Sequence, residues 1–417
     1  MIIYQIFCGR QERANLQNHK YHVFKQMETF DWNKLKQAGF DTVYLLGVWD
    51  YRGPVIVTEE SGSLLEFKTG RMPSIFAVSD HRQPLPQLGT ITDLRQLIQI
   101  IHLAGLKVLV DFIPNQTGTT HPWTQTHPEF YLRNNQSFVT AFSQDVYLLD
   151  YNQPELRNEM IQTLRWIKQC GIDGVRADMA HLTPASFWRE AISQLKQNEQ
   201  DFIFLAEAYS QSVLDWQPLI QLLDAGFDLI YHEFLYRNLK MVYEENKPAD
   251  YLLDHLNYFI NQHFNIKLVH YLANHDDAMI EGICSRQPAI GTLLLFLYGS
   301  TLFYNGQLNS LNRRLGHHWL DILPYSQSEF KEIPAWFRNV VQLKKSLNPQ
   351  IEKLEQIDQE IIRAEMNLNG LPAQLLLNLS PKPYLLANDS FMNKEGLLHR
   401  YAQNEMLAPG EAEIFFR

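Results

Sequence analysis

The chain of 417 residues has few cysteines, no run of basic residues and no long apolar run. Its three cysteines, Cys8, Cys170 and Cys284, are widely separated, which predicts neither a disulfide framework nor a metal cluster. The longest apolar run, near 292–299, is far too short to cross a bilayer. Because the start MIIYQIFCGR has no basic segment followed by an apolar one, we expect a cytoplasmic protein.

Acidic residues outnumber basic ones, 46 to 36, and the net charge is −10. An acidic chain without a Lys/Arg run argues against nucleic acid or an anionic membrane as a partner. It remains compatible with neutral substrates such as sugars. Hydrophobic residues make up 45% of the chain, which is ample for a large core, but composition leaves the oligomeric state open.

Short apolar runs rich in β-branched residues alternate with amphipathic helical runs along most of the chain. Strands that alternate with helices of about 10–15 residues are typical of parallel βαβ units, and eight such units favour a (β/α)8 TIM barrel, an α/β fold. The eight strand candidates are 2–7, 42–47, 107–113, 174–179, 202–208, 227–233, 267–275 and 300–306.

Two segments interrupt this alternation. Residues 115–150 contain no convincing helix and indicate a short subdomain inserted after the third strand. Beyond about residue 348 the helical period gives way to short strand-like runs and turns, which predicts a small antiparallel β domain. We therefore predict a catalytic barrel over 1–114 and 151–348, the inserted subdomain, and a C-terminal domain over 349–417.

Acidic residues stand at the ends of four predicted strands, where barrels of this type carry their chemistry. One such acid alone is commonly only a helix N-cap, which is how we interpret Asp150 and Glu233. Several buried carboxylates together cost much free energy unless they are paired, metal-bound or used in catalysis. The four segments are DFIPNQ at 111–116, GVRADMAH at 174–181, FLAEAY at 204–209 and YLANHDD at 271–277.

Converging carboxylates beside an arginine suit retaining glycoside chemistry. One carboxylate attacks the anomeric carbon, and a second protonates the leaving oxygen and then activates water. Arg176 and Asp178 share one face of their strand, so the arginine would keep that carboxylate ionised. The ordinary alternatives are a structural ion pair of Arg176 with Asp111 or Asp178, and a core role for His275. Aromatic residues near the rim, such as Trp49 and Trp123, are expected to be mostly core.

Ordered motifs over nearly the whole chain resemble those of the α-amylase family of retaining α-glycosidases and transglycosidases (glycoside hydrolase family 13). The matching segments are DFIPNQ, GVRADMAH, FLAEA at 204–208, ANHDD at 273–277, GSTLFYNGQ at 299–307 and, in the second loop, PSIFAVSDHR at 73–82. The resemblance implies a TIM barrel with a B domain after strand 3 and a C-terminal β-sandwich.

Carried over by position, the resemblance implies Asp178 as the nucleophile and Glu207 as the general acid/base. Asp276 is implied as the residue that stabilises the transition state by holding sugar hydroxyls, and Arg176 as the residue that positions Asp178. His275 is implied to contact the sugar at the cleavage site.

Further substrate contacts are implied for Phe76, as a stacking platform, and for Asp80, Gln116 and His181. The position of Asn115 often binds a structural calcium ion in similar proteins, and no other cofactor is expected. His181 has a second interpretation, since it could also cap the helix that begins near Pro184.

The sequence departs from the family pattern at several positions. Gln116 stands where histidine is usual, Leu308 where glutamate is common, and His81 where tyrosine is frequent. Glutamine can donate a hydrogen bond to a sugar hydroxyl but carries no charge. The short insertion after strand 3 bears on calcium binding. These changes concern substrate preference and rate more than the reaction class, because the three carboxylates remain.

We predict hydrolysis of α-linked glucans or maltooligosaccharides by double displacement, with the Asp178 and Glu207 carboxyl groups about 5–5.5 Å apart rather than about 6.5–9.5 Å. One alternative is a transglycosylase, in which a sugar replaces water as the acceptor. A second is a non-catalytic amylase-like protein that binds carbohydrate or a partner. A third, a barrel whose acids bind a catalytic metal, lacks a fitting His and carboxylate spacing. The sugar, linkage and chain length stay open.

Overall fold

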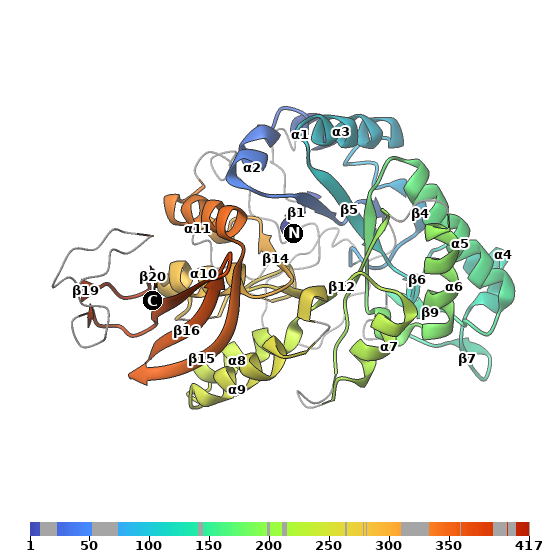
Figure 1. The fold of residues 1–417 in the computed structure, drawn as a ribbon. Coiled ribbons are helices and arrows are strands. Elements are labelled where there is room, and N and C mark those ends of the chain that lie inside the picture. The colour runs from blue at the N-terminus through green and yellow to red at the C-terminus, as the bar shows by residue number, and fades with distance from the viewer. Residues whose placement is uncertain are drawn as a thin grey trace, which may run out of the picture.

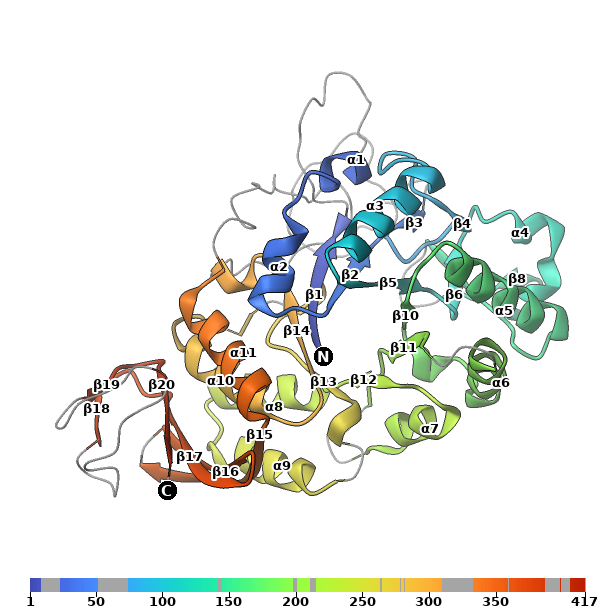
Figure 2. The ribbon, with the colours of Figure 1, turned by 45° about the horizontal axis from the view of Figure 1, so that its top comes forward.

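Eight parallel strands form a closed barrel in the computed structural model, and helices surround it (Figures 1 and 2). The structure describes residues 1–8, 23–51, 74–140, 145–197, 201–210, 215–262, 265–277, 279–280, 282–309, 333–358, 360–386, 398 and 406–416. In order around the barrel the strands are β1 (Ile2–Phe7), β14 (Ser300–Tyr304), β13 (Leu268–His270), β12 (Leu229–Tyr231), β11 (Ile203–Ala206), β10 (Gly174–Ala177), β5 (Lys107–Phe112) and β2 (Thr42–Leu46). The predicted (β/α)8 barrel is confirmed.

The strands are almost wholly buried, because helices cover the outer face of the barrel and side chains fill its interior. A capping box begins α3: the Thr90 side chain accepts from the Asp93 backbone N–H, and Asp93 accepts from that of Thr90. The helices are α1 (Val23–Met27), α2 (Trp32–Ala38), α3 (Ile91–Leu103), α5 (Pro154–Gln169), α6 (Ala185–Lys196), α7 (Gln217–Ala225), α8 (Glu233–Tyr243), α9 (Asp250–Ile260), α10 (Gln287–Phe296) and α11 (Ala335–Leu347).

Several observed strands end before the predicted segments do. The segment 174–179 is a strand only to Ala177, and 267–275 only to His270. After Ala177 the backbone turns sharply, since Met179 has a left-handed conformation with φ 42°. The residues past these strand ends form the rim of the barrel and carry the candidate site.

The region after β5 contains short paired strands. β6 (Gln116–Gly118) pairs antiparallel with β9 (Val146–Leu148), and between them lie α4 (Trp123–Thr126), η3 (Pro128–Phe130) and the β7 (Arg133–Asn134)–β8 (Ser137–Phe138) hairpin. The loop after β2 forms a second hairpin, β3 (Trp49–Asp50) with β4 (Asp80–Pro84). At Gly118 a Cβ atom would lie 2.5 Å from the carbonyl oxygen of Ala77, so only glycine permits this close approach of the two loops.

Beyond α11 the chain forms an antiparallel sheet. α11 ends where Asn348 takes a left-handed conformation, and the sheet order is β15 (Pro349–Asp358), β16 (Ile361–Leu368), β17 (Leu371–Asn378) and β20 (Ala412–Phe416). β18 (Tyr384–Leu385) pairs with β19 (Met406–Leu407). The sheet lies against the α9 and α10 side of the barrel, where the Asn257 amide group exchanges two hydrogen bonds of 2.8 Å with the Leu354 backbone (Figure 2).

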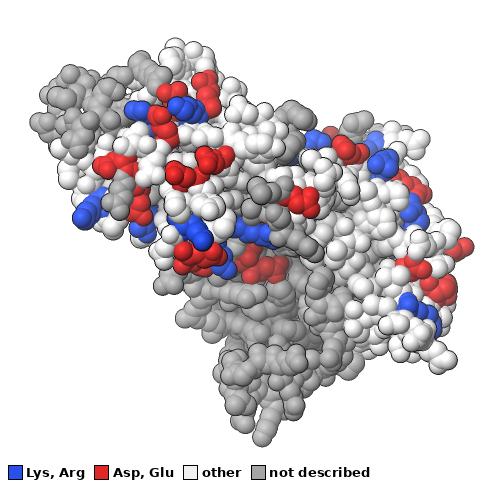
Figure 3. Space-filling view, turned by 90° about the horizontal axis from the view of Figure 1, so that it is seen from below, with Lys and Arg blue, Asp and Glu red and all other residues white. Residues whose placement is uncertain are grey.

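The surface seen in Figure 3 carries acidic and basic side chains side by side rather than in separate patches of one sign. In the part of the chain that the structure describes, no helix is both long and apolar enough to span a bilayer. Cys8 and Cys170 are buried free thiols.

Candidate active site

The ends of β5, β10 and β11 bring the predicted catalytic groups to the same rim. Arg176 on β10 pairs in register with Asp111 on β5 and with Leu205 on β11. Because Ala177 is level with Ala206, the next residues along the two strands are Asp178 and Glu207. The parallel register therefore explains why one arginine reaches acids from three neighbouring strands.

The Arg176 guanidinium is fully buried and contacts three carboxyl groups. Its Nη1 lies 2.7 Å from Asp178 Oδ1 and 3.4 Å from Asp111 Oδ1, and its Nη2 contacts Glu207 Oε1. Burial raises the pKa of Asp178, while the guanidinium acts in the opposite direction. One cation cannot balance three buried carboxylates, so this group favours retention of a proton.

Asp111 is held by groups of the barrel interior. The Tyr44 hydroxyl donates to Asp111 Oδ1, and the Gly47 backbone N–H donates to Oδ2 at 2.9 Å. The side chain is 1% exposed, and burial raises its pKa despite these donors and Arg176. With both oxygens engaged, Asp111 fixes Arg176 rather than facing a substrate.

Glu207 accepts hydrogen bonds at both of its carboxyl oxygens. The Met179 backbone N–H donates to Oε2 at 2.8 Å, and the Tyr209 hydroxyl donates to Oε1 at 2.8 Å. Arg176 also contacts Oε1. These three contacts fix the carboxyl group beside Asp178, on the same guanidinium.

The third acid, Asp276, lies in the loop after β13 beside His275. His275 Nε2 is 2.9 Å from Asp276 Oδ2, and His275 Nδ1 is 2.9 Å from Gln5 Nε2 on β1. Asn274 shapes this loop, because its side-chain oxygen accepts from the backbone N–H groups of Asp276 at 2.8 Å and Asp277 at 2.7 Å. The asparagine of the ANHDD motif thus fixes the turn that carries both aspartates.

Phe76 covers the buried arginine. Its ring lies 5.4 Å from the Arg176 guanidinium carbon and 5.5 Å from the His275 ring, measured to ring centroids. An aromatic face over a desolvated guanidinium is a favourable cation–π contact. The loop after β2 is thereby joined to the site built by β10 and β13.

Comparisons with known proteins agree with this arrangement. The family model "Alpha amylase, catalytic domain" matches residues 33–131. The chain is thus similar to members of the α-amylase family. Among curated relatives, the α-1,4-glucan:maltose-1-phosphate maltosyltransferase of Bifidobacterium longum is 29% identical over 226 residues, 51% of this chain and 29% of that protein. The Corynebacterium pseudotuberculosis transferase is 29% identical over 225 residues, 51% of this chain and 32% of that protein. The chain therefore spans about a third of the length of these relatives.

Solved structures of α-amylases and related enzymes share the fold. An α-amylase from Lactobacillus plantarum superposes with a TM-score of 0.80 at 21% identity, covering 100% of this chain and 98% of that one. A cyclic α-maltosyl-(1→6)-maltose hydrolase from Arthrobacter globiformis, in complex with maltose, gives 0.74 at 15% identity, with 100% and 98% covered. At such identities these structures show the fold alone.

Departures from the family pattern have visible contacts here. Gln116 donates from Nε2 to Asp178 Oδ2 at 3.3 Å, and Asn115 donates from Nδ2 to Gln116 Oε1 at 2.8 Å. The amide thus fills the position next to the predicted nucleophile. His81 lies away from these acids: its Nε2 is 3.1 Å from the Ile113 carbonyl oxygen, and its ring stacks on Trp123.

The other predicted substrate contacts lie in two different places. His181 follows β10, and its Nδ1 accepts from the Tyr209 backbone N–H at 3.5 Å, next to the Glu207 loop. Burial lowers the pKa of His181. Asp80 lies on β4, where its carboxylate accepts from the Arg82 backbone N–H at 2.7 Å. The structure therefore brings His181 to the site and places Asp80 in the β3–β4 hairpin.

Asn115 is the position implied to bind calcium, and its side chain contacts Gln116. The Asn115 amide nitrogen points to Gln116, and the described residues contain no group of three or more His, Cys, Asp or Glu side chains that could hold a metal ion. The calcium ion implied by the family resemblance stays a prediction, and no catalytic step below involves it.

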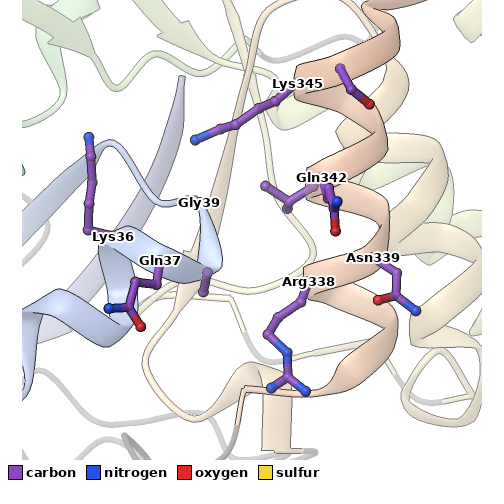
Figure 4. Close-up of a pocket in the computed structure, with 10 residues that line it drawn as sticks. Lys36, Gln37, Gly39, Arg338, Asn339, Gln342 and Lys345 are labelled. Atoms are coloured by element: carbon purple, nitrogen blue, oxygen red, sulfur yellow. The ribbon is translucent and has the colours of Figure 1, made fainter.

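A groove lies between α2 and α11 (Figure 4). This groove of about 640 Å³ is lined by polar and basic side chains, among them Lys36, Arg338 and Lys345. Lys36 and Lys345 stand in the last turns of their helices, where cations complement the helix dipole. That role accounts for the two lysines.

Sequence reasoning missed two contributors to the site, Met179 and Tyr209. Met179 donates its backbone N–H from a left-handed conformation. No residue type in this segment predicts that conformation. Tyr209 stands two residues after Glu207, a spacing that could have drawn attention only once Glu207 was a candidate.

Proposed function

We propose that the chain cleaves α-glucosidic bonds of α-glucans or maltooligosaccharides with retention of configuration, through a covalent glycosyl-Asp178 intermediate. The observation that carries this proposal is the contact of one buried guanidinium with both Asp178 and Glu207. Retention requires two carboxyl groups close together, one as nucleophile and one as acid/base.

In the first step an oxygen of Asp178 attacks the anomeric carbon and the bond to the leaving oxygen breaks. Asp178 Oδ1 is held by Arg176 at 2.7 Å, whereas Oδ2 has the longer contact of 3.3 Å with Gln116, so Oδ2 is the better placed nucleophile. Glu207 gives its proton to the leaving oxygen. In the second step Glu207 takes a proton from water, which attacks the glycosyl ester and frees Asp178.

Asp276 and His275 have the chemistry to hold sugar hydroxyls during both steps. Their contact of 2.9 Å presents a carboxylate and an imidazole side by side at the rim, next to Phe76. Hydrogen bonds of this kind accelerate the reaction when they strengthen in the transition state.

Transfer to a sugar acceptor is the second candidate function, because the curated relatives named above are maltosyltransferases. The chemistry up to the glycosyl-Asp178 ester is the same for hydrolysis and transfer. The two functions differ only in whether water or a sugar hydroxyl enters the second step. The sugar donor of the full-length relatives is not assigned to this chain, because the chain covers about a third of their length.

The test combines a nucleophile variant with trapping of the ester. Asp178→Asn should lower turnover of p-nitrophenyl α-maltoside at least about 10³-fold, and a 5-fluoro-α-glycosyl fluoride should label Asp178 in the wild type, detected by peptide mass spectrometry. The matched control is Asp150→Asn, since the Asp150 carboxylate accepts from Asn152 and Gln153 in the turn before α5. Unchanged turnover in Asp178→Asn would disprove the assignment, and wild type inactive toward every α-glucoside would favour the non-catalytic alternative.

A further inference from the structure

Two of the groups that contact Glu207 cannot change their role. The Met179 backbone N–H and the Arg176 guanidinium are donors without any acceptor capacity. Both stabilise the carboxylate and oppose its protonation. The proposed reaction nevertheless requires Glu207 to be a carboxylic acid before the first step and a carboxylate before the second.

Tyr209 is the partner that suits both states. A phenol both donates and accepts, so its hydroxyl can donate to the Glu207 carboxylate and accept from the carboxylic acid at the same 2.8 Å contact. We propose that Tyr209 is a positioning residue for the acid/base, and that its hydrogen bond to Glu207 Oε1 reverses direction each time Glu207 gains or loses its proton. This inference rests on the proposed function.

The surroundings of Tyr209 support this role. Its backbone N–H donates to His181 Nδ1 at 3.5 Å, and the next carbonyl, of Ser210, accepts from Arg237 at 2.9 Å. These contacts hold the segment that carries both Glu207 and Tyr209. Burial and nearby carboxylates raise the pKa of Tyr209 well above its usual value, so the phenol keeps its proton across the working pH range.

Other charged and titratable groups lie near Glu207 or Tyr209 and are unchanged in both Tyr209 variants. They come from the end of β10, from η4 (Ala180–Leu182), from β12 and from the loop after β13. The groups are Arg176, Asp178, His181, Tyr231, Tyr271, Asp276 and Asp277.

The first test is Tyr209→Phe, assayed with two substrates. Cleavage of maltopentaose needs an acid to protonate the leaving oxygen, whereas the fluoride ion leaves α-maltosyl fluoride without one. Loss of a hydrogen bond to a charged group should lower kcat/KM for maltopentaose about 10- to 100-fold, with a smaller loss for the fluoride. Because the phenol donates to the carboxylate, its loss should favour the protonated form of Glu207. The alkaline limb of the pH profile, which reports protonated Glu207, should therefore move to higher pH.

A second variant should shift the alkaline limb of the pH profile in the opposite direction without changing the packing. Replacement of Tyr209 by 3-fluorotyrosine makes the phenol a stronger donor, so the alkaline limb should move to lower pH. This variant also keeps the inference testable if Tyr209→Phe does not fold. The matched control is Tyr231→Phe: the buried Tyr231 hydroxyl also senses the charge of Glu207 but has no hydrogen-bond partner among the described residues. Its profile should coincide with that of the wild type.

Coincident pH profiles for the wild type and both Tyr209 variants, with kcat/KM within about twofold, would overturn the inference. A second result would also overturn it. If Tyr209→Phe lowered kcat/KM by the same factor in a Glu207→Ala protein, assayed with azide as the external nucleophile, then Tyr209 would act independently of Glu207. Failure of the proposed function looks different, because the wild type itself would turn over neither maltopentaose nor the fluoride.

Discussion

Buried acids outnumber buried cations around Arg176, and individual residues show how the chain tolerates this excess. Asp111 receives donors from Tyr44 and Gly47, and Glu207 from Met179 and Tyr209. Asp277, the second aspartate of ANHDD, accepts weaker hydrogen bonds. It accepts from Asn274 Nδ2 at 3.3 Å and from the Tyr271 hydroxyl at 3.4 Å, both of them long contacts.

Asp277 should therefore destabilise the fold at neutral pH. Burial and the charge of Asp276 raise its pKa to about 6, above the value near 3.9 of an unfolded chain. The folded state binds more protons between these values, so stability falls as the pH rises from about 4 through 6. Asp277→Asn should raise the free energy of unfolding in urea by about 1–3 kcal/mol at pH 8 and by less at pH 5.

The control for this prediction is Asp250→Asn, the same change at an exposed position in the first turn of α9. It should alter stability by no more than about 0.5 kcal/mol at either pH, and slightly for the worse, because an acid there complements the helix dipole. An Asp277→Asn protein no more stable than wild type at pH 8 would contradict the raised pKa.

At the scale of elements, three histidines join the start of α8 with β13 and α9. His255 Nε2 is 3.0 Å from His232 Nε2, His232 Nδ1 is 2.8 Å from His270 Nδ1, and His270 Nε2 faces the Tyr298 carbonyl oxygen. Because a carbonyl can only accept, His270 must donate there, His232 must donate to His270, and His255 to His232. Three neutral imidazoles satisfy every one of these contacts.

This histidine chain should make the barrel sensitive to acid. Burial lowers the pKa of His255 to about 3 and of His270 to about 4, below the unfolded value near 6.5. The unfolded chain thus binds more protons below pH 6.5, and stability falls as the pH drops from there toward 4. Asp277 and Glu233, with pKa values raised to about 6 and 7, act in the opposite direction, so a variant is needed to isolate the effect.

His255→Gln, which keeps a donor toward His232, should flatten the pH dependence of the free energy of unfolding between pH 6 and 4.5. The slope should fall by up to about 1.4 kcal/mol per pH unit, the value for one proton. His127→Gln changes an exposed histidine and should leave the slope as in the wild type. Equal slopes in all three proteins would show that the chain of imidazoles does not set the acid stability.

The contact of α2 with α11 depends on one glycine. Gly39 ends α2 with φ 103°, and a Cβ there would overlap Val341 Cγ1 on α11 (Figure 4). Gly39→Ala should cost about 2–4 kcal/mol in unfolding free energy, from left-handed strain plus overpacking. Gly370→Ala has similar strain at φ 91° but open space, and should cost about 1–2 kcal/mol. Equal losses of unfolding free energy in the two variants would mean that Val341 can move aside at little cost.

The elements also show how far the sequence could be read. Apolar runs located all eight barrel strands, because each strand is buried on both faces. The same runs overestimated strand length at 178–179 and 271–275, where the chain leaves the sheet to form the rim. There the conformation depends on distant partners: Met179 donates to Glu207, and Asn274 accepts from the following backbone. Local composition cannot reveal such contacts, nor the meeting of three histidines from separate elements.

At the scale of the whole molecule, the question is which acceptor would reach the proposed glycosyl-Asp178 ester. The barrel, the β6–β9 region and the C-terminal sheet match the fold of hydrolases such as the Lactobacillus plantarum α-amylase. The curated sequence relatives are transferases. The described site presents the same Asp178, Glu207 and Asp276 for either outcome, so the fold does not decide between water and sugar.

A product profile distinguishes water from a sugar as the acceptor. We expect hydrolysis to dominate, so maltopentaose at low concentration should yield only shorter α-configured products, resolved by chromatography and by NMR of the anomeric proton. Raising maltopentaose or adding maltose increases the concentration of acceptor hydroxyls, and a hydrolase should then give at most a small fraction of longer chains. A transferase would instead give products longer than maltopentaose from the first turnovers, in a yield that rises with acceptor while glucose release stays low. Asp178→Asn, assayed beside it, should form neither class of product, which shows that both arise from the same ester.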